Sequence, residues 1–343
     1  MTDVVRRVLN IGYYIKNQKV KAGLLALDVF KAFDCVEWPT LKILIEKLGS
    51  GKKIRKVINK LYSENKARIV INDGDTETIT LSQRTRQGCP LSLILFALLM
   101  EVLANAIRKD SLIEGIGVYK KTKINLFADD TLLTFQNPIA TIERVYSHLN
   151  EFGKYSGLQI NWEKSEMMLY NHSKEEMDVL KEKYKLKMVG SIKYLGIDIP
   201  KNIQELKKIN YEKLKKDIKD KIDKYGKVKL SWFIRIAAIK MKVLPKINFL
   251  FWMIPIKFSD QELKKIQGVM EVYCNGGKRA RISKALWYEP LKKGGLGLPN
   301  VRNYWVANQL RMVPDIIAVN RDLLWSDIEL KELREIGDPI ETY

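Results

Sequence analysis

The feature that most constrains this chain is a pair of adjacent aspartates between two strand-like segments. Residues 123–127 lead into Asp129 and Asp130, and residues 131–135 lead out of them with β-branched and aromatic character. This pattern predicts a tight β-hairpin with the acid pair in a semi-buried turn. Neighbouring carboxylates repel each other unless a cation neutralises them, and Mg²⁺ binds carboxylates together with substrate phosphates. The pair therefore indicates metal-dependent phosphoryl chemistry, whereas four residues alone would also fit an ordinary surface turn.

Another aspartate stands in a similar setting well upstream. The short apolar run at 23–27 ends in Asp28, which indicates a buried strand that delivers one carboxylate at its end. Between the two acid sites, residues 86–92 are turn-prone, and Pro90 is expected to mark the start of a long apolar helix at 91–107.

These segments, in this order, resemble the palm motifs of reverse transcriptases, and they are most similar to the non-LTR (LINE-type) retrotransposon branch. The matching segments are DVFKAFD at 28–34, TRQGCPLS at 85–92, LFADD at 126–130, SGLQINWEKSEM at 156–167 and KYLGIDI at 193–199. The resemblance continues through 235–257 and 278–300 to about residue 315. It implies an α+β fold, a right-hand polymerase palm with an antiparallel sheet and helices, followed by a helical thumb domain.

The resemblance also implies roles for the acids. Asp28 and Asp129 would bridge two Mg²⁺ ions, or Mn²⁺ in their place, with the backbone carbonyl of Val29 as a further ligand and Asp130 as a helper. The implied reaction is RNA-directed DNA synthesis, in which deoxynucleoside triphosphates extend a DNA primer on an RNA template. Lys164 matches a lysine that protonates the leaving pyrophosphate, and a lysine in solvent is the alternative.

Further contacts follow from the same resemblance. It places nucleotide contacts at Phe33, Gln87 and Gly88 and a template or structural contact at Arg86. It also implies a primer grip, a tight turn, at Tyr194, Leu195 and Gly196. Phe33 resembles a steric gate, an aromatic ring that clashes with a 2′-OH and so favours deoxynucleotides. Simple core packing is the alternative for this ring.

The charge balance favours an anionic partner. The 343 residues carry a net charge of +20, and basic surfaces gain affinity by displacing counterions from nucleic acid. A nonspecifically basic surface is the alternative. Residues 201–240 hold thirteen Lys and Arg against five Asp and Glu, which resembles a thumb that grips the template–primer duplex and equally fits a solvated helix face. In a second basic cluster at 278–293, Trp287 and Tyr288 would stack on unpaired bases, although Trp287 equally fits a core.

The expected organisation is a palm with a remnant of the fingers at 1–200, a helical thumb at 201–275 and a basic extension with an unassigned tail at 276–343. Helices are expected at 4–17, 40–48, 53–65, 91–107 and 141–155. A hairpin across 67–81 would turn at Asp73-Gly74, and strands are expected at 167–170 and 194–199.

Other sequence features limit the alternatives. Three scattered cysteines and two histidines form no CxxC or Cys/His cluster, so a zinc site is not expected and the thiols are expected to be reduced. The apolar run at 91–100 is too short to span a bilayer and meets Glu101. An intracellular protein is therefore expected, and the resemblance implies a cytoplasmic ribonucleoprotein and the nucleus.

The chain departs from the family pattern in two places. Only 27 residues precede Asp28, so most of the fingers, with the basic residues that clamp the triphosphate, are expected to be absent. Leu93 stands where the family commonly has proline. These departures suggest a truncated palm–thumb portion and leave two hypotheses. One is an active polymerase, with or without a second chain that supplies the fingers. The other is a catalytically impaired, nucleic-acid-binding remnant.

Overall fold

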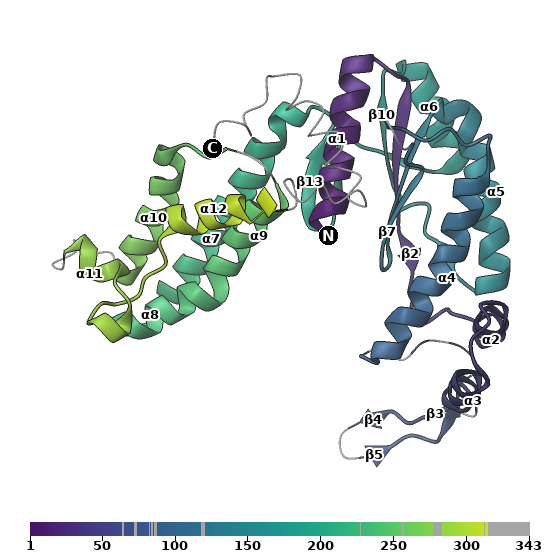
Figure 1. The fold of residues 1–343 in the computed structure, drawn as a ribbon, viewed down its shortest axis with the longest axis horizontal. Coiled ribbons are helices and arrows are strands. Elements are labelled where there is room, and N and C mark those ends of the chain that lie inside the picture. Colours follow the sequence, from purple (N-terminus) through teal and green to yellow (C-terminus); the bar gives the residue numbers. More distant parts are fainter. Residues whose placement is uncertain are drawn as a thin grey trace. The chain divides into compact units, whose positions relative to one another are not determined.

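The computed structural model describes residues 1–63, 65–71, 74–81, 83, 85, 88–117, 121–226, 228–254, 257–276, 283–311 and 313–314. The chain divides into two compact units, one of residues Tyr14–Tyr194 and one of Met1–Tyr13 with Leu195–Tyr343 (Figure 1). The fold is α+β, as expected. The functional division into palm, thumb and extension stays a prediction.

A five-stranded sheet forms the centre of the Tyr14–Tyr194 unit. Its strand order is β11 (Lys187–Met188), β10 (Glu166–Tyr170), β1 (Ala22–Leu27), β8 (Asp130–Gln136) and β7 (Ile124–Phe127). Neighbouring strands are antiparallel except β10 and β11, which are parallel, so the expected antiparallel sheet is mixed at one edge. The near-continuous apolar sequence of β1 follows from its central place, because almost all of the strand is buried.

Two long helices cover part of this sheet. α4 (Pro90–Lys109) begins with proline in its first turn, as expected, and packs against β7 and α5 (Pro138–Ser156). Among the described helices, α4 alone is long and apolar enough to cross a membrane, a property that core helices of soluble proteins share. One face of α4, which includes Leu95, Phe96 and Leu99, is buried in the core of the unit.

The other elements of this unit are short. They are β2 (Val29–Phe30), α2 (Trp38–Lys47), α3 (Lys52–Leu61), β3 (Lys66–Ala67), β4 (Val70–Ile71), β5 (Gly74–Asp75), β6 (Ile79–Thr80), β9 (Gln159–Ile160), α6 (Lys174–Tyr184) and β12 (Ser191–Tyr194). β3 pairs with β6 and β4 with β5, which confirms a hairpin at 67–81, whereas Asp73 lies outside the described residues. The strand predicted at 194–199 is confirmed from Ile197 onward and is interrupted before it. The chain turns at Leu195-Gly196, and β12 ends before it.

The other unit is mainly helical. It contains β13 (Ile197–Pro200), the 3₁₀ turns η1 (Ile203–Glu205) and η3 (Leu291–Lys293), the π-helical turn η2 (Ile239–Val243), and the helices α7 (Leu206–Gly226), α8 (Trp232–Ala238), α9 (Leu244–Met253), α10 (Asp260–Cys274), α11 (Lys284–Tyr288) and α12 (Val301–Leu310). α12 packs against both α9 and α10. The first helix, α1 (Thr2–Gln18), crosses the division between the two units.

A substitution of Phe135 in β8 would show how much its buried side chain stabilises the sheet. Its side chain is fully buried and stands opposite Gly23 of β1. We expect Phe135→Ala to lower the free energy of unfolding by about 3–5 kcal/mol, because the change removes apolar contacts and leaves a cavity. Denaturant titration followed by circular dichroism measures this loss. Val179→Ala on the exposed face of α6 is the control, with an expected change within about 0.5 kcal/mol. Equal effects of the two variants would contradict this account of the core.

A buried carboxylate joins α4 to α5. Asp110 follows α4, and its Oδ2 lies 2.5 Å from Arg144 Nε and 2.6 Å from His148 Nε2, both on α5. Its Oδ1 accepts the N–H of Leu112 at 2.9 Å. Burial alone would raise the pKa of Asp110, but the hydrogen bonds from His148, Arg144 and Leu112 outweigh it and lower the pKa to about 2.

This depressed pKa predicts a pH dependence of stability. Because the folded state holds the Asp110 proton less tightly than the unfolded state does, the stabilisation is full above the ordinary pKa near 3.8 and is lost as the pH falls towards about 2. We expect Asp110→Asn to lower the Tm at neutral pH and to flatten the change in Tm between these pH values. Thermal melts of both proteins across this range test the expectation. A parallel decline in both would contradict it.

Candidate active site

The adjacent aspartates lie at the tip of the β7–β8 hairpin, as expected. Phe127 pairs with Asp130, and Ala128 and Asp129 form the two-residue turn between them. Ala128 has a φ of 54°, a left-handed conformation that costs an L-residue on the order of 1–2 kcal/mol. The expectation of a semi-buried pair was wrong, because both aspartates are exposed. A two-residue turn leaves too few neighbouring atoms to cover them.

Asp28 lies at the same end of the sheet. β1 and β8 are antiparallel neighbours whose last register pair is Leu27 with Thr131. Asp28 follows Leu27 and Asp130 precedes Thr131, so both aspartates lie at this end of the sheet. The sheet therefore brings together carboxylates that are far apart in the sequence. The number of residues between the two strands does not predict which residues pair. The two apolar runs that end in aspartate did indicate that each strand carries a carboxylate at its end.

The three carboxylates are open to solvent. Asp28, Asp129 and Asp130 are exposed, and no described residue forms an ion pair or a side-chain hydrogen bond with their carboxylates. Partial desolvation and the charge of Asp129 raise the pKa of Asp130, and Lys193 opposes this rise. Within the described ranges, no His, Cys, Asp and Glu side chains form a group of three or more that would hold a metal by itself. Other oxygen ligands would have to complete any metal site here.

A loop at 161–165 contacts the backbone of Asp28. The N–H of Asn161 donates to the carbonyl of Asp28 at 2.8 Å, and the N–H of Asp28 donates to Ser165 Oγ at 3.1 Å. Lys164 lies in this loop, where its N–H donates to Asn161 Oδ1 at 3.2 Å. The Lys164 side chain is exposed. Lys164 was predicted from the sequence, whereas Ser165 was not, because its burial and its bond to Asp28 are visible only in the structure.

Val29 follows Asp28 directly, and Phe33 lies five residues after Asp28. Val29 of β2 pairs with Ile160 of β9, next to the loop. The ring of Phe33 is half-buried and packs on that of Phe96 in α4, with centroids 4.6 Å apart. Both the N–H and the Oγ1 of Thr85 donate to the carbonyl of Phe33, at 2.7 and 3.0 Å. Phe33 therefore has a core partner and a fixed backbone, which suits either of its expected roles.

The segment before α4 is only partly described. Arg86 and Gln87 lie outside the described residues. Gly88 has a φ of 80°, and a Cβ built on it would meet no atom within 4 Å. Gly88 therefore provides a backbone conformation that other residues rarely adopt, in open space just before α4.

The expected primer-grip residues fall at the division between the units. Tyr194, the last residue of β12, is buried, and its hydroxyl lies 3.5 Å from the carbonyl of Asn125 in β7. Leu195 and Gly196, with φ values of 48° and 80°, belong to the helical unit. A Cβ on Gly196 would lie 3.2 Å from the ring of Phe249. The turn thus favours glycine for its backbone angle, and a side chain here would also need the Phe249 ring to shift slightly.

The basic helical unit has both paired and unpaired cations. On α7, exposed lysines that form no ion pair with any residue in the described part of the chain are Lys208, Lys216, Lys219 and Lys224. Trp287 is buried against Trp232 at a centroid distance of 6.2 Å, so core packing is correct for this residue and base stacking is not. Residues 277–282 of the second basic cluster lie outside the described residues.

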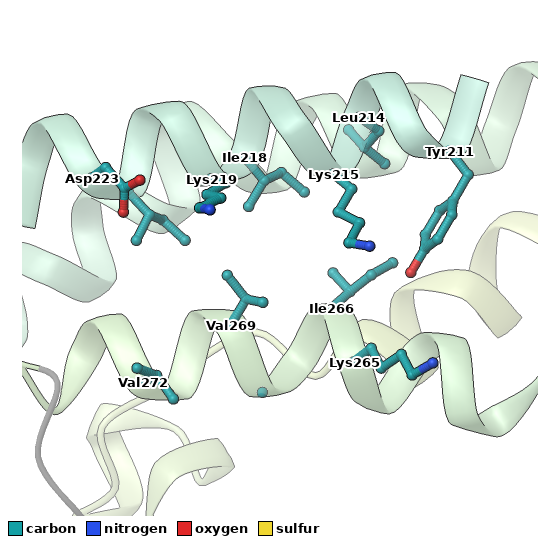
Figure 2. A pocket seen from close by; sticks show the side chains of 12 residues that line it. Tyr211, Leu214, Lys215, Ile218, Lys219, Asp223, Lys265, Ile266, Val269 and Val272 are labelled. Carbon is teal, nitrogen blue, oxygen red and sulfur yellow. The ribbon is translucent and has the colours of Figure 1, made fainter. Parts of the chain in front are cut away.

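A groove of about 560 Å³ lies between α7 and α10 in this unit. Figure 2 shows Ile218 on one side and Ile266 and Val269 on the other, with Lys215 and Lys219 extending from α7. Its lining is almost wholly apolar. It holds none of the predicted site residues.

A mixed sheet with carboxylates at one end, followed in the chain by a helical unit, has the elements expected of the polymerase palm–thumb fold. The family model described as "Reverse transcriptase (RNA-dependent DNA polymerase)" matches residues 5–199, more than half of the chain. The chain belongs to the reverse transcriptase family.

Curated relatives place it beside LINE-type retrotransposon proteins. It is 22% identical over 339 residues to the transposon TX1 uncharacterized 149 kDa protein of Xenopus laevis, covering 97% of this chain and 25% of that protein. It is 25% identical over 299 residues to the Pol polyprotein of the type-1 retrotransposable element R2 of Nasonia vitripennis, covering 82% of this chain and 28% of that protein. The chain thus spans about a quarter of the length of these relatives.

A solved structure has a similar fold. The apo telomerase of Candida tropicalis has a TM-score of 0.51 and 12% sequence identity, with 96% of this chain and 57% of that chain covered. At this identity the likeness shows the fold alone.

Proposed function

We propose that this chain is an RNA-directed DNA polymerase of a non-LTR retrotransposon, which extends a DNA primer on an RNA template with deoxynucleoside triphosphates. The observation that carries the proposal is the meeting of Asp28 with Asp129 and Asp130 at one end of the sheet in a member of the reverse transcriptase family. Nucleotidyl transfer depends mainly on positioning and on neutralising phosphate charge.

The donor set fits a hard divalent cation. Asp28 and Asp129 would hold Mg²⁺ or Mn²⁺, with Asp130 and the carbonyl of Val29 as further ligands. Their carboxylates are exposed and form no ion pair with a described residue, although the charge of Lys193 acts on Asp130. Mg²⁺ prefers one or two carboxylates completed by substrate phosphates. When bound, the ions would activate the primer 3′-OH and offset the charge of the triphosphate.

The remaining residues would bind and orient the substrates. Lys164, in the loop that contacts Asp28, would donate a proton to the leaving pyrophosphate. Phe33, held on Phe96 and by Thr85, would exclude the 2′-OH of ribonucleotides. Gln87 and Gly88 would lie along the incoming nucleotide, Arg86 would contact the template, and the turn at Tyr194, Leu195 and Gly196 would position the primer end.

The unpaired lysines of α7 support the nucleic-acid part of the proposal. Lysines without carboxylate partners are available to neutralise phosphates, and each neutralised phosphate makes binding more sensitive to salt. This observation supports duplex binding whether or not the chain polymerises. A nucleic-acid-binding remnant without activity is therefore the second candidate function.

Primer extension on an RNA template separates the two candidates. We would incubate the chain with an annealed DNA primer, deoxynucleotides and Mg²⁺, and repeat the reaction with EDTA. Extension that EDTA abolishes supports the polymerase. Binding to the RNA–DNA duplex that weakens steeply with salt, without extension, would refute it and support the remnant.

A further inference from the structure

The backbone of Asp28 is held by a side chain where strand pairing ends. The ladder between β1 and β10 has its last register pair at Ala26 and Glu166. Two residues beyond Ala26, the N–H of Asp28 donates to Ser165 Oγ at 3.1 Å, and this hydroxyl donates to the carbonyl of Asn161 at 2.8 Å. The hydroxyl thus accepts the N–H of Asp28 at a position where β10 no longer pairs with β1.

Burial makes this hydroxyl hard to replace. Ser165 has no exposed surface, so an apolar residue here would leave the N–H of Asp28 without this acceptor. Either water would have to replace this acceptor beside a buried residue or the local chain would have to shift, and both changes cost free energy. Asn161 holds the other side of the same residue, because its N–H donates to the carbonyl of Asp28 at 2.8 Å. The backbone that carries the Asp28 carboxylate is therefore fixed from both sides by one loop.

We propose that Ser165 is a positioning residue that sets the Asp28 carboxylate for divalent-cation binding and couples it to Lys164. Ser165 follows Lys164 in the chain, and the N–H groups of both residues donate to Asn161, Lys164 to its Oδ1 at 3.2 Å and Ser165 to its carbonyl at 2.9 Å. The loop thereby links the backbone of Asp28 to that of Lys164, through the Ser165 hydroxyl on one side and Asn161 on the other. This inference rests on the proposed function, in which Asp28 is a metal ligand.

Ser156 provides a matched control. It is also fully buried in the same unit, its Oγ donates to the carbonyl of Phe152 at 2.7 Å, and it accepts the N–H of Leu158 at 3.2 Å. Ser156→Ala therefore removes the same kind of hydrogen bonds without touching Asp28. If Ser165→Ala weakens Mn²⁺ binding more than Ser156→Ala does, the difference is due to the contact between Ser165 and Asp28 and not to the loss of a buried hydroxyl in general.

The experiment measures Mn²⁺ binding by EPR titration. The binding that is lost in Asp28→Asn is the part that depends on Asp28. We expect Ser165→Ala to weaken this binding roughly 10–100-fold, as changes to the residues behind a metal ligand do, and Ser156→Ala to leave it unchanged. Ser165→Thr, which keeps the hydroxyl, should restore most of the affinity. In primer extension, Ser165→Ala should raise the Mg²⁺ concentration that gives half-maximal rate.

The outcomes separate this inference from the proposed function. Unchanged Mn²⁺ affinity in Ser165→Ala, equal losses in both serine variants, or wild-type binding that does not depend on Asp28 would each overturn the role of Ser165. If Ser165→Ala fails to fold, the nearly isosteric Ser165→Cys, a weaker hydrogen-bonding group, makes the same comparison. A wild-type chain that binds Mn²⁺ through Asp28 and extends no primer would refute the polymerase, while the serine variants would still decide the role of Ser165.

Discussion

Asp129→Ala is expected to abolish Mg²⁺-dependent primer extension, with a loss of at least about 10³-fold in rate, because a carboxylate metal ligand contributes several kcal/mol of transition-state stabilisation. Binding to the RNA–DNA duplex should be retained or slightly strengthened, since the change removes a negative charge. Folding should be unaffected, because Asp129 is exposed in a turn and has no described side-chain partner. Single-turnover extension and fluorescence anisotropy measure the two properties.

Asp178→Ala is the matched control for this variant. Asp178 is also exposed and lies on α6, away from the hairpin tip. The control removes one negative charge from the same unit and should leave both extension and binding unchanged. Normal extension by Asp129→Ala would show that Asp129 is not a metal ligand. Equal losses in both variants would show that net charge, and not the carboxylate at the hairpin tip, controls the rate.

Phe33→Val is expected to lower the preference for deoxynucleotides over ribonucleotides by roughly 10–100-fold. Shortening the side chain opens the space that a 2′-OH would occupy, and steric differences of this size are worth about 1–3 kcal/mol in discrimination. The loss of contact with Phe96 should also lower the Tm. The ratio of kcat/KM for a deoxynucleotide to that for its ribonucleotide is the measurement, because it separates selectivity from the amount of folded protein.

Phe30→Val controls for the loss of an aromatic ring near Asp28. Phe30 lies in β2, and its side chain is 46% exposed, so the control should change neither stability nor selectivity by much. A lower Tm in Phe33→Val with unchanged selectivity would assign Phe33 to core packing alone. A change in selectivity for both variants would point to movement of the whole segment after Asp28.

The parts of the fold that the sequence predicted are those with strong local signals. The acid hairpin, the start of α4 at Pro90 and the helices before residue 156 follow from apolar periodicity and turn residues that act over a few positions. The turn at Leu195-Gly196 was implied by the resemblance and not by a local signal, because leucine rarely adopts a positive φ.

The position of the three aspartates at one end of the sheet was predicted, but their environment was not. The exposure of a side chain depends on which distant segments pack beside it, and the neighbouring residues in the sequence do not reveal this. The examples here are the exposed Asp129 and Asp130 and the buried Trp287 and Ser165. Ser165 illustrates the limit most clearly. A serine beside a lysine looks like a surface residue, and only the approach of β1 to β10 makes its hydroxyl a partner of Asp28.

The bond from Asp28 to Ser165 also has a consequence for the order in which the protein forms. It joins residues 137 positions apart, so the N-terminal carboxylate leaves the ribosome long before the residue that fixes it. Contacts of such long range form slowly, because a large loop must close before they can contribute. Nascent chains that end before residue 165 would carry all three aspartates and still lack a fixed Asp28. The backbone at Asp28 is therefore fixed only after synthesis has passed residue 165.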